Sequence, residues 1–298
     1  MNKILLLAPR QAHTSLRLVE AAHKLGLELD VLETRDIVFV ASHDKTGLFY
    51  NGRDLVAAYD ALIVRDFHPY ISEALTVARL FADAGKVVVD KSLTDEGYSI
   101  SKMNDYLLLG IAGVPVPETH QIYDHAGLKA TADKLGYPCV LKGTHGSHGN
   151  HVFKINLPSQ IDDLIQKYPE GQLLLQEYLP ADFDYRVITI GYKAVPKIVK
   201  RQPANGDFRT NFELTADWES LDVKDYPELV RLAENSARIL RREFSAVDIR
   251  YRGDKPYVLE ANRKPGFEGF EETTGLDVAE LFLKNLVSKT TVNSRSSA

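Results

Sequence analysis

Three side chains in the segment VDIRYRGDKPYVLEANR could share a metal ion. Glu260 and Asn262 are two residues apart, so in an extended strand they project from the same face. If the turn consists of residues 253–255, Asp248 lies opposite Glu260, with Cβ atoms about 5 Å apart. Two carboxylates and an amide oxygen favour Mg²⁺ or Mn²⁺, which prefer oxygen ligands. The alternatives are ordinary surface acids on an edge strand, or a hairpin register that separates the groups.

Basic side chains precede this acidic hairpin. The segment VPKIVKRQPANGDFRTN contains Lys197, Lys200, Arg201 and Arg209. Basic residues that face a carboxylate and metal cluster provide the electrostatics that phosphoryl transfer needs. A solvent-facing basic loop is the alternative. Upstream, in PADFDYR, Asp184 and Arg186 share one face if the chain is extended.

A glycine- and histidine-rich segment, KGTHGSHGNH, spans residues 142–151. Its histidines favour a metal site, whereas glycines at short intervals after a lysine favour a loop that binds phosphate. Glycine lacks a side chain, so backbone N–H groups can approach phosphate oxygens. No carboxylate or cysteine flanks the histidines, which argues against the metal site.

Composition excludes several classes of protein. The 298 residues are 44% hydrophobic and 26% charged, which is typical of a soluble protein of roughly two or three domains. A net charge of −5 argues against a nucleic-acid partner. The single cysteine, Cys139, excludes an intrachain disulfide, is expected to lie buried in a strand, and fits a cytoplasmic location. The apolar run in MNKILLLAPR is too short for a signal peptide or a membrane span.

Alternating apolar strands and helices predict a parallel α/β domain over residues 1–95. The expected strands are 3–9, 29–33, 60–67 and 85–91, and the expected helices are 15–29, which ends near Gly26, and 70–85. The domain contains no glycine-rich dinucleotide fingerprint, which argues against a dehydrogenase.

Two further regions follow, a central one over residues 96–175 and a C-terminal one over residues 176–288. We expect helices at 99–113, 125–136 and 226–244, and strands at 138–143, 171–179, 184–202 and 245–263. Turns at Gly191 and Gly253 favour an antiparallel C-terminal sheet. The polar tail, residues 289–298, is expected to be disordered.

Six segments, in this order, resemble the ATP-grasp superfamily and most closely its RimK-type amino-acid ligases. They are SKMNDYLLLGIAGVPVPET, PCVLKGTHGSHGNHV, LLLQEYLPADFDYRV, KRQPANGDFRTN, VDIRYRGDKPYVLEANRKPGFEG and FEETTGLDVAEL. The resemblance covers nearly the whole chain. It implies an α/β fold of the α+β ATP-grasp type, in which an N-terminal parallel pre-ATP-grasp domain precedes two α+β subdomains that clamp ATP between them.

The resemblance also implies which residues bind ATP. A lysine that ends a strand and a G-S-x-G-x-G-V loop would cover the phosphates, and backbone groups after the next strand would bind adenine. The implied positions are Lys102 and Lys142 for phosphate oxygens, Gly146, Ser147 and Gly149 in the loop, Gln176, Glu177, Tyr178 and Leu179 around adenine, Asp184 for ribose, and Asn211.

The implied metal ligands are Asp248, Glu260 and Asn262, which agrees with the strand-face argument, and the implied cofactors are ATP with two Mg²⁺ or Mn²⁺ ions. The implied reaction is attack of a substrate carboxylate on the γ-phosphate, followed by displacement of phosphate by an amine. Arg201 would stabilise the acyl phosphate, and Arg186 and Arg209 would hold phosphate or carboxylate groups.

The expected partners are a small-molecule or peptide carboxylate and an amino-acid amine, with glutamate one candidate, and neither nucleic acid nor membrane. A homo-oligomer is left open. Arg65 corresponds to an arginine that faces the cleft in related ligases, and Arg263 and Lys264 follow the metal strand. These three are the candidate substrate residues, although Lys264 could equally be an ordinary surface lysine.

Two departures from the family pattern bear on function. His151 replaces the last glycine of the loop, which could stiffen it or bring an imidazole near the γ-phosphate. The chain also reads FRTNFELTADWES where RimK-type ligases carry an Arg-Gly-Gly stretch, which weakens a role in glutamylating ribosomal proteins. The alternative function is a regulatory protein that binds ATP without ligation; Arg201 beside a complete metal triad argues against it.

Overall fold

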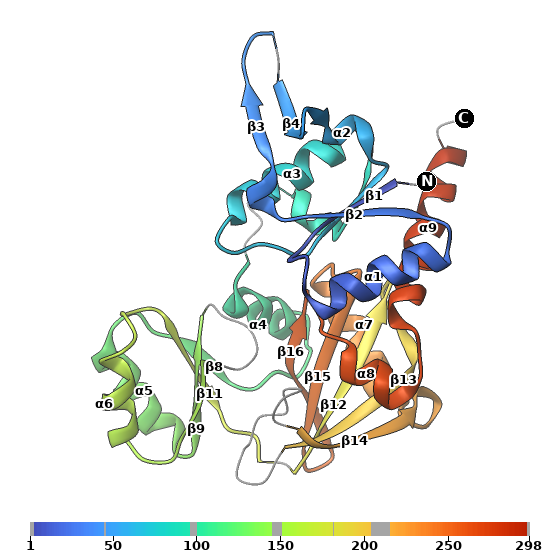
Figure 1. Ribbon diagram of the computed structural model, residues 1–298. Coiled ribbons are helices and arrows are strands. Elements are labelled where there is room, and N and C mark those ends of the chain that lie inside the picture. The colour runs from blue at the N-terminus through green and yellow to red at the C-terminus, as the bar shows by residue number, and fades with distance from the viewer. Residues whose placement is uncertain are drawn as a thin grey trace.

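The computed structural model describes residues 3–44, 46–95, 100–144, 151–180, 182–203 and 215–296. Its N-terminal region is a parallel sheet with strand order β2-β1-β6-β7 (Figure 1). The elements are β1 (Lys3–Leu7), α1 (His13–Lys24), β2 (Glu28–Leu32), β6 (Ala61–Val64), α3 (Ile71–Asp83) and β7 (Val87–Val89). Ile4 to Leu7 of β1 are completely buried, as expected for a central strand of a parallel sheet.

A small antiparallel sheet, which we did not predict, projects from this region (Figure 1). It consists of β3 (Val38–Ala41), β4 (Thr46–Tyr50) and β5 (Arg53–Asp54), followed by the short helix α2 (Leu55–Ala58). The side chain of Asp54 accepts a hydrogen bond from the Ala57 backbone N–H and so caps α2.

The central region forms a separate antiparallel sheet with strand order β10-β9-β11-β8, which we call the lid sheet (Figure 1). Its elements are β8 (Thr119–Gln121), α5 (His125–Leu135), β9 (Cys139–Gly143), β10 (Val152–Ile155), α6 (Ser159–Ile165) and β11 (Leu173–Glu177). Both helices pack on one face, and the core between them and the sheet includes Leu128, Cys139 and Ile161. The predicted burial of Cys139 in a strand is therefore confirmed.

The C-terminal sheet is antiparallel, as predicted, with strand order β14-β13-β12-β15-β16. Its strands are β12 (Asp184–Ile190), β13 (Lys193–Pro203), β14 (Thr215–Asp222), β15 (Phe244–Arg252) and β16 (Lys255–Asn262). One face packs against α7 (Pro227–Ile239), in a core that includes Val187 and Leu229. The other face packs with α8 (Glu268–Thr274) and α9 (Val278–Ser296), through Ile188 and Phe282.

The N-terminal domain and the C-terminal sheet share one hydrophobic core. Ile4 and Leu18 belong to the same buried cluster as Ile188 and Phe282. Helix α1 lies beside α9 in Figure 1. These two regions therefore form a continuous body, whereas the lid sheet has its own core.

Helix α4 (Lys102–Ile111) connects the regions. We expected it to belong to the central region, but its Leu109 packs with Leu229 of α7 in the core of the C-terminal sheet. Its N-terminus is capped by Ser101, whose hydroxyl accepts a hydrogen bond from the Asn104 N–H. Helix α4 therefore belongs structurally to the C-terminal sheet and borders the lid sheet.

The C-terminal tail differs from expectation. Helix α9 continues to Ser296, although the polar composition of residues 289–298 led us to expect disorder. Within the described part of the chain, no helix is both long and apolar enough to cross a membrane.

Candidate functional site

Four charged side chains gather on the face of the C-terminal sheet that lies opposite α7. Asp184 and Arg186 come from β12, Arg201 from β13 and Asp248 from β15. Strand pairing places Asp184 opposite Arg201, and Arg186 opposite Asp248. Because residues two apart on a strand share a face, the cluster lies on the side of Ile188, which packs toward α8 and α9.

Bidentate ion pairs join these four residues into one network. Arg201 donates to the Asp184 carboxylate from Nε at 2.8 Å and from Nη2 at 2.9 Å. The same Nη2 lies 3.0 Å from Oδ1 of Asp248. Arg186 donates to both oxygens of Asp248, from Nε and from Nη2, each at 2.8 Å. Asp248 therefore bridges the two guanidinium groups.

Three of the four residues are almost fully buried, and Arg186 is partly buried. The exposed fraction is 1% for Arg201, 2% for Asp184 and 8% for Asp248. Burial alone would raise the pKa of the Asp248 carboxyl, but the charges of Arg186 and Arg201 outweigh it and hold that pKa below its ordinary value. Burial disfavours the charged form of Arg201, yet Asp184 and Asp248 raise its pKa above its ordinary value. Arg201 and Asp248 therefore remain charged at neutral pH.

Asp184 lies in a different environment from the one that the ribose assignment requires. Both of its carboxylate oxygens accept hydrogen bonds from Arg201, and only 2% of its surface is exposed. A sugar hydroxyl could not reach this carboxylate unless the ion pair opened. The structure therefore places Asp184 as the partner that orients Arg201.

One donor of Arg201 is left over. Its Nη1 is buried, and no described residue provides it with a hydrogen-bond acceptor. The guanidinium carbon lies 5.9 Å from the ring of Trp218, the only tryptophan in the sequence. A buried N–H group without an acceptor is costly, so this atom marks a place where an anionic oxygen would be stabilising.

In the hairpin of β15 and β16, Asp248 pairs with Glu260 as predicted, but the turn is shorter than we assumed and a bulge compensates for the difference. Arg252 pairs with Lys255, so the turn has two residues rather than the three that we assumed. Gly253, at φ 59°, takes the first position of this turn, as the type II′ geometry requires. A β-bulge then shifts the register by one residue and restores the opposition of the two carboxylates.

The three predicted metal ligands lie together, but their surroundings differ. The Asn262 Nδ2 donates to Oδ2 of Asp248 at 3.3 Å, so Asp248 accepts hydrogen bonds from Asn262 as well as from both arginines. The Glu260 carboxylate has no hydrogen bond or ion pair with any described residue. Among the described residues, no three His, Cys, Asp or Glu side chains form a metal cluster. The oxygen donors of Glu260 and Asn262 still fit a hard divalent cation in their chemistry.

The two predicted phosphate lysines come together where β9 meets α4. Lys142 Nζ donates to the Tyr106 hydroxyl at 3.2 Å, and Lys102 Nζ donates to the Gly143 carbonyl at 3.4 Å. Neither lysine forms an ion pair with a described carboxylate. Their positive charges are therefore available to a ligand that binds where β9 meets α4.

The predicted adenine segment lies where β11 leaves the lid sheet. Gln176 is 2% exposed, and its Nε2 donates to the Thr119 hydroxyl at 2.7 Å. The Glu177 carboxylate accepts a hydrogen bond from the Glu118 N–H at 3.0 Å and pairs with Arg252 at 2.6 Å. The Arg252 contact ties this segment to the tip of the β15–β16 hairpin.

The next two residues, Tyr178 and Leu179, also contact other parts of the protein. The Tyr178 ring lies 4.0 Å from the Lys154 ammonium, and the Leu179 carbonyl accepts a hydrogen bond from Arg250 at 3.2 Å. Side chains and a backbone carbonyl are thus engaged within the protein, so any adenine contact here would use the remaining backbone groups.

Two of the predicted substrate residues are neighbours beside the shared core. Arg65 donates to the Pro265 carbonyl at 2.8 Å and stacks over the Phe244 ring at 5.5 Å. Burial lowers the pKa of Arg65 to about 10, although Asp90 acts in the opposite direction. Burial and the charge of Arg65 both lower the pKa of Lys264. Because the charge of Arg65 disfavours the protonated form of Lys264, an anionic ligand beside the two cations would be stabilising.

Arg263 has a different position from this pair. It forms an ion pair with the buried Asp90 and lies 3.3 Å from the Ser92 hydroxyl. Its side chain therefore joins the end of β16 to the N-terminal domain, which is a structural contact rather than an open binding position.

Several predicted residues lie outside the described part of the chain. They are Gly146, Ser147, Gly149, Arg209 and Asn211. His151 is described, and its Nδ1 lies 2.6 Å from the Tyr168 hydroxyl. The imidazole is thus held by the segment after α6.

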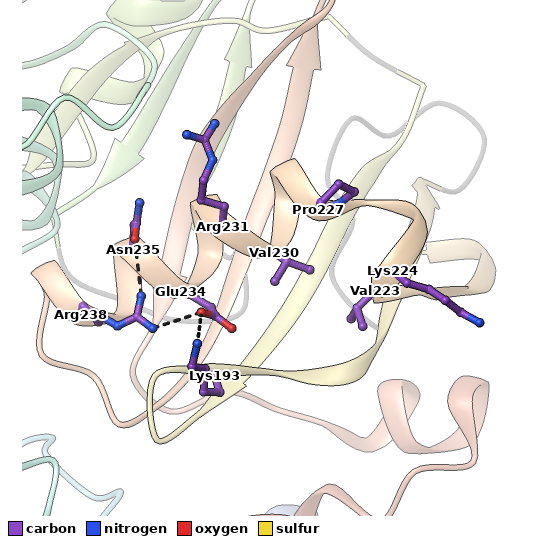
Figure 2. Close-up of a pocket in the computed structure, with 9 residues that line it drawn as sticks. All are labelled: Lys193, Val223, Lys224, Pro227, Val230, Arg231, Glu234, Asn235 and Arg238. Atoms are coloured by element: carbon purple, nitrogen blue, oxygen red, sulfur yellow. Dashed lines mark hydrogen bonds and ion pairs between the residues drawn. The ribbon is translucent and has the colours of Figure 1, made fainter.

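A groove of about 390 Å³ lies on α7 and thus on the opposite side of the C-terminal sheet (Figure 2). Figure 2 shows Glu234 in contact with Lys193 and Arg238, which compensates its charge. Since Val187 and Leu229 pack between α7 and the sheet, this groove is separate from the Asp248 cluster.

Comparisons with known proteins give family matches over nearly the whole chain. Residues 1–94 match the family described as RimK PreATP-grasp domain, and residues 100–286 match the RimK-like ATP-grasp domain. A probable alpha-L-glutamate ligase of Marinomonas sp. (strain MWYL1) is 28% identical over 286 residues, which cover 92% of this chain and 91% of the relative. The protein of the same name from Maridesulfovibrio salexigens is 30% identical over 276 residues, which cover 91% and 90%.

Solved structures show the same fold. The ATP-grasp ligase PsnB, complexed with a minimal precursor, superposes with a TM-score of 0.73 at 20% identity, over 97% of this chain and 99% of PsnB. A PsnB complex with minimal precursor, Mg and ADP gives a TM-score of 0.71 at 19% identity, over 97% and 98% of the two chains. A RimK domain ATP-grasp protein from Sphaerobacter thermophilus gives 0.68 at 22% identity, over 96% and 99%.

Proposed function

The chain belongs to the RimK-like ATP-grasp family and is an ATP-dependent ligase that forms amide bonds, and from this premise we propose the roles of its residues and the class of its substrates. We propose that it joins the amine of an amino acid, glutamate in the first instance, to the carboxylate of a peptide or small acceptor. The observation that carries the proposal is the buried Arg201, whose Nη1 lacks a described acceptor beside the facing carboxylates Asp248 and Glu260.

The proposed nucleotide contacts follow from the distribution of charge. Lys102 and Lys142 lie together without described acidic partners, so their ammonium groups can bind phosphate oxygens. Backbone groups of residues 177–179 would bind adenine, and Gln176 would shape its pocket. Gly146, Ser147, Gly149 and Asn211 remain sequence-based candidates for phosphate contacts. We assign Asp184 to the orientation of Arg201 rather than to ribose.

The proposed metal donors are Glu260, Asn262 and Asp248. No described residue binds the Glu260 carboxylate, so both of its oxygens are available to a metal ion. The side-chain amide of Asn262 can supply its Oδ1. Asp248 can contribute only where one of its present donors yields, because Arg186, Arg201 and Asn262 already bind it. Bound Mg²⁺ would neutralise charge on the transferred phosphoryl group. We propose Mg²⁺ rather than Mn²⁺ because a PsnB complex of the same fold contains Mg and ADP; two ions remain the expectation from the family.

The proposed reaction has two steps. An acceptor carboxylate oxygen attacks the γ-phosphorus, the bond to the bridging oxygen breaks, and ADP leaves, which yields an acyl phosphate. The amine then attacks the acyl carbon, the carbon–oxygen bond to phosphate breaks, and the amine proton passes to solvent or phosphate. Nη1 of Arg201 would donate to the acyl phosphate, and Arg186 would hold Asp248 in position. Arg209 remains a sequence-based candidate for binding the negative charge of the acyl phosphate.

The cationic pair of Arg65 and Lys264 supports an acidic substrate. Arg65 is buried and Lys264 is exposed, and the pKa values of both are lowered, so a carboxylate bound beside them would relieve an unfavourable charge arrangement. Relatives named probable alpha-L-glutamate ligase make glutamate the first amino acid to test. Arg263 is assigned to the contact with Asp90.

The test is Mg²⁺-dependent release of phosphate from ATP by the purified protein, with pools of amino acids, dipeptides and carboxylate acceptors. We expect release that requires one acid and one amine together, and a product whose mass equals that of both minus water. Release that needs no amine would contradict the second step. Tight ATP binding without release in any pool, including peptide acceptors, would instead favour a regulatory role.

A further inference from the structure

The bulge in β16 is held by a residue that the proposed function does not use. Leu259 is the extra residue, because pairing with β15 passes from Val258 directly to Glu260. The Tyr106 hydroxyl of α4 donates a hydrogen bond to the Leu259 carbonyl at 2.7 Å. A bulge leaves its extra residue outside the ladder, so this phenol satisfies a carbonyl that the sheet does not.

The same phenol holds the lid lysine. Lys142 Nζ donates to the Tyr106 oxygen at 3.2 Å, and the ammonium lies 5.8 Å from the ring centre. A hydroxyl carries one proton, and here it points to Leu259. The oxygen lone pair is therefore left for Lys142, and the phenol, only 6% exposed, is fixed in this direction.

A second contact from α4 reaches the other side of Glu260. Asp105 accepts two hydrogen bonds from Nη2 of Arg242, at 2.8 and 2.7 Å. Nη1 of Arg242 donates to the Ala261 carbonyl. The carbonyls on both sides of Glu260 are thus bound by groups that belong to α4 or are anchored to it.

Helix α4 also contacts the lid strand at two points one turn apart. Lys102 and Tyr106 are at i and i+4, so they lie on the same face of α4. Lys102 contacts the Gly143 carbonyl, and Tyr106 contacts the neighbouring Lys142. One helical face therefore joins β9, which carries a proposed phosphate ligand, to β16, which carries a proposed metal ligand.

We propose that Tyr106 is a positioning residue that fixes Lys142 relative to Glu260, so that nucleotide and divalent cation bind cooperatively. Without the hydroxyl, Lys142 loses its acceptor and the Leu259 carbonyl loses its donor at the same time. The inference rests on the proposed function, since it takes Lys142 as a phosphate ligand and Glu260 as a metal ligand.

The experiment is a double-mutant cycle of Tyr106→Phe and Lys142→Met, read by calorimetric titration of a non-hydrolysable ATP analogue with and without Mg²⁺. Phenylalanine keeps the ring and removes the hydroxyl. The factor by which Mg²⁺ tightens nucleotide binding is expected to fall at least about fivefold in Tyr106→Phe. In the Lys142→Met background, the same substitution is expected to change nucleotide affinity by less than about twofold, because the two residues act together.

Tyr59→Phe is the matched control. Tyr59 is also a buried tyrosine, and its hydroxyl donates to Asp30 at 2.6 Å in the N-terminal domain. This variant is expected to keep the coupling between Mg²⁺ and nucleotide. Asp105→Asn provides an independent second variant, because it weakens the contact on the other side of Glu260, and we expect a similar loss of coupling.

The outcomes separate the two proposals. Wild-type protein that binds no nucleotide would overturn the proposed function and this role of Tyr106 with it. Wild-type protein with coupled binding, together with normal coupling in both Tyr106→Phe and Asp105→Asn, would overturn the role of Tyr106 alone. Independent, additive effects of Tyr106→Phe and Lys142→Met would do the same.

Discussion

The two sheets that border the candidate site hold their charges in opposite ways. In the C-terminal sheet, Arg201 and Asp184 form a buried bidentate pair with exposed fractions of 1% and 2%. In the lid sheet, Lys142 is partly exposed and donates to a neutral hydroxyl. The lid's ion pair between Lys129 and Asp162 is largely open to solvent.

This difference fits the different roles that we propose for the charged residues of the two sheets. Charges fixed in a dry sheet stabilise developing charge without reorganisation at the moment of reaction. A lysine that is held by one hydroxyl can move when a nucleotide binds. Its position relative to the C-terminal sheet then depends on the element that carries the hydroxyl. That element is helix α4, which packs on the C-terminal sheet and contacts the lid strand β9.

The largest expected effect is on stability, from Arg201→Leu. This change leaves Asp184 and Asp248 buried with one guanidinium fewer, and breaking a buried ion pair typically costs about 3–5 kcal/mol. Chemical denaturation should show a loss of this size in the free energy of unfolding. The matched change in the lid sheet is Lys129→Leu, which removes an exposed ion pair and should cost at most about 1 kcal/mol. Equal losses in the two variants would remove the contrast between the sheets.

The position of the charged residues could be predicted from the sequence to the extent that it follows from strand periodicity. The period of two put Glu260 and Asn262 on one face, and the hairpin put Asp248 opposite. The assumed three-residue turn was wrong, because Gly253 favours a two-residue turn and the bulge at Leu259 compensates. A bulge has no clear sequence signal here, since it depends on a donor from α4.

The role of Asp184 shows a different limit. The family resemblance assigned it to ribose, although Asp184 and Arg201 face each other across the β12–β13 hairpin. A hairpin register counted from the turn at Gly191 would have suggested this pair only approximately, because the pairing of β12 with β13 shifts register between Val187 and Thr189. The pairing therefore had to be seen in the structure.

Long-range contacts could not be predicted at all. Tyr106 and Leu259 are 153 residues apart, and Arg263 and Asp90 are 173 apart. Each pair joins different elements of the fold, and no local pattern in MNDYLLLG distinguishes Tyr106 from an ordinary core tyrosine. The parallel N-terminal sheet was predictable because β1, β6 and β7 are mostly continuous apolar runs, while the edge strand β2 alternates polar and apolar residues.

The second expected effect is on catalysis without loss of stability. Glu260→Gln removes a charge that no described residue compensates, so unfolding should hardly change, whereas Mg²⁺-dependent phosphate release should fall at least about 100-fold. Asp254→Asn, at the exposed tip of the same hairpin, is the control and should retain activity. Near-normal turnover of Glu260→Gln would remove Glu260 from the metal site.

The third prediction concerns the competition at Asp248. Arg186→Gln removes a bidentate donor, which frees carboxylate lone pairs and lowers the local positive charge. We expect a several-fold lower Mg²⁺ concentration for half-maximal activity, together with a lower kcat. Both values come from a Mg²⁺ titration of phosphate release at saturating ATP. An increased Mg²⁺ requirement would mean that Arg186 supports the metal site instead of competing with it.

The smallest effect is expected in the lid, at His151. Its imidazole interacts with the Tyr168 hydroxyl at 2.6 Å, which makes a catalytic role near the γ-phosphate unnecessary to explain its presence. His151→Gly should therefore change kcat by less than about twofold and lower stability by about 1 kcal/mol, since it loses an exposed hydrogen bond and adds chain flexibility. Tyr168→Phe removes the same bond from the other side and should have the same effect on kcat. A large loss of kcat in His151→Gly alone would show that the imidazole acts on substrate, and that the lid sheet, like the C-terminal sheet, contributes a group fixed for the reaction.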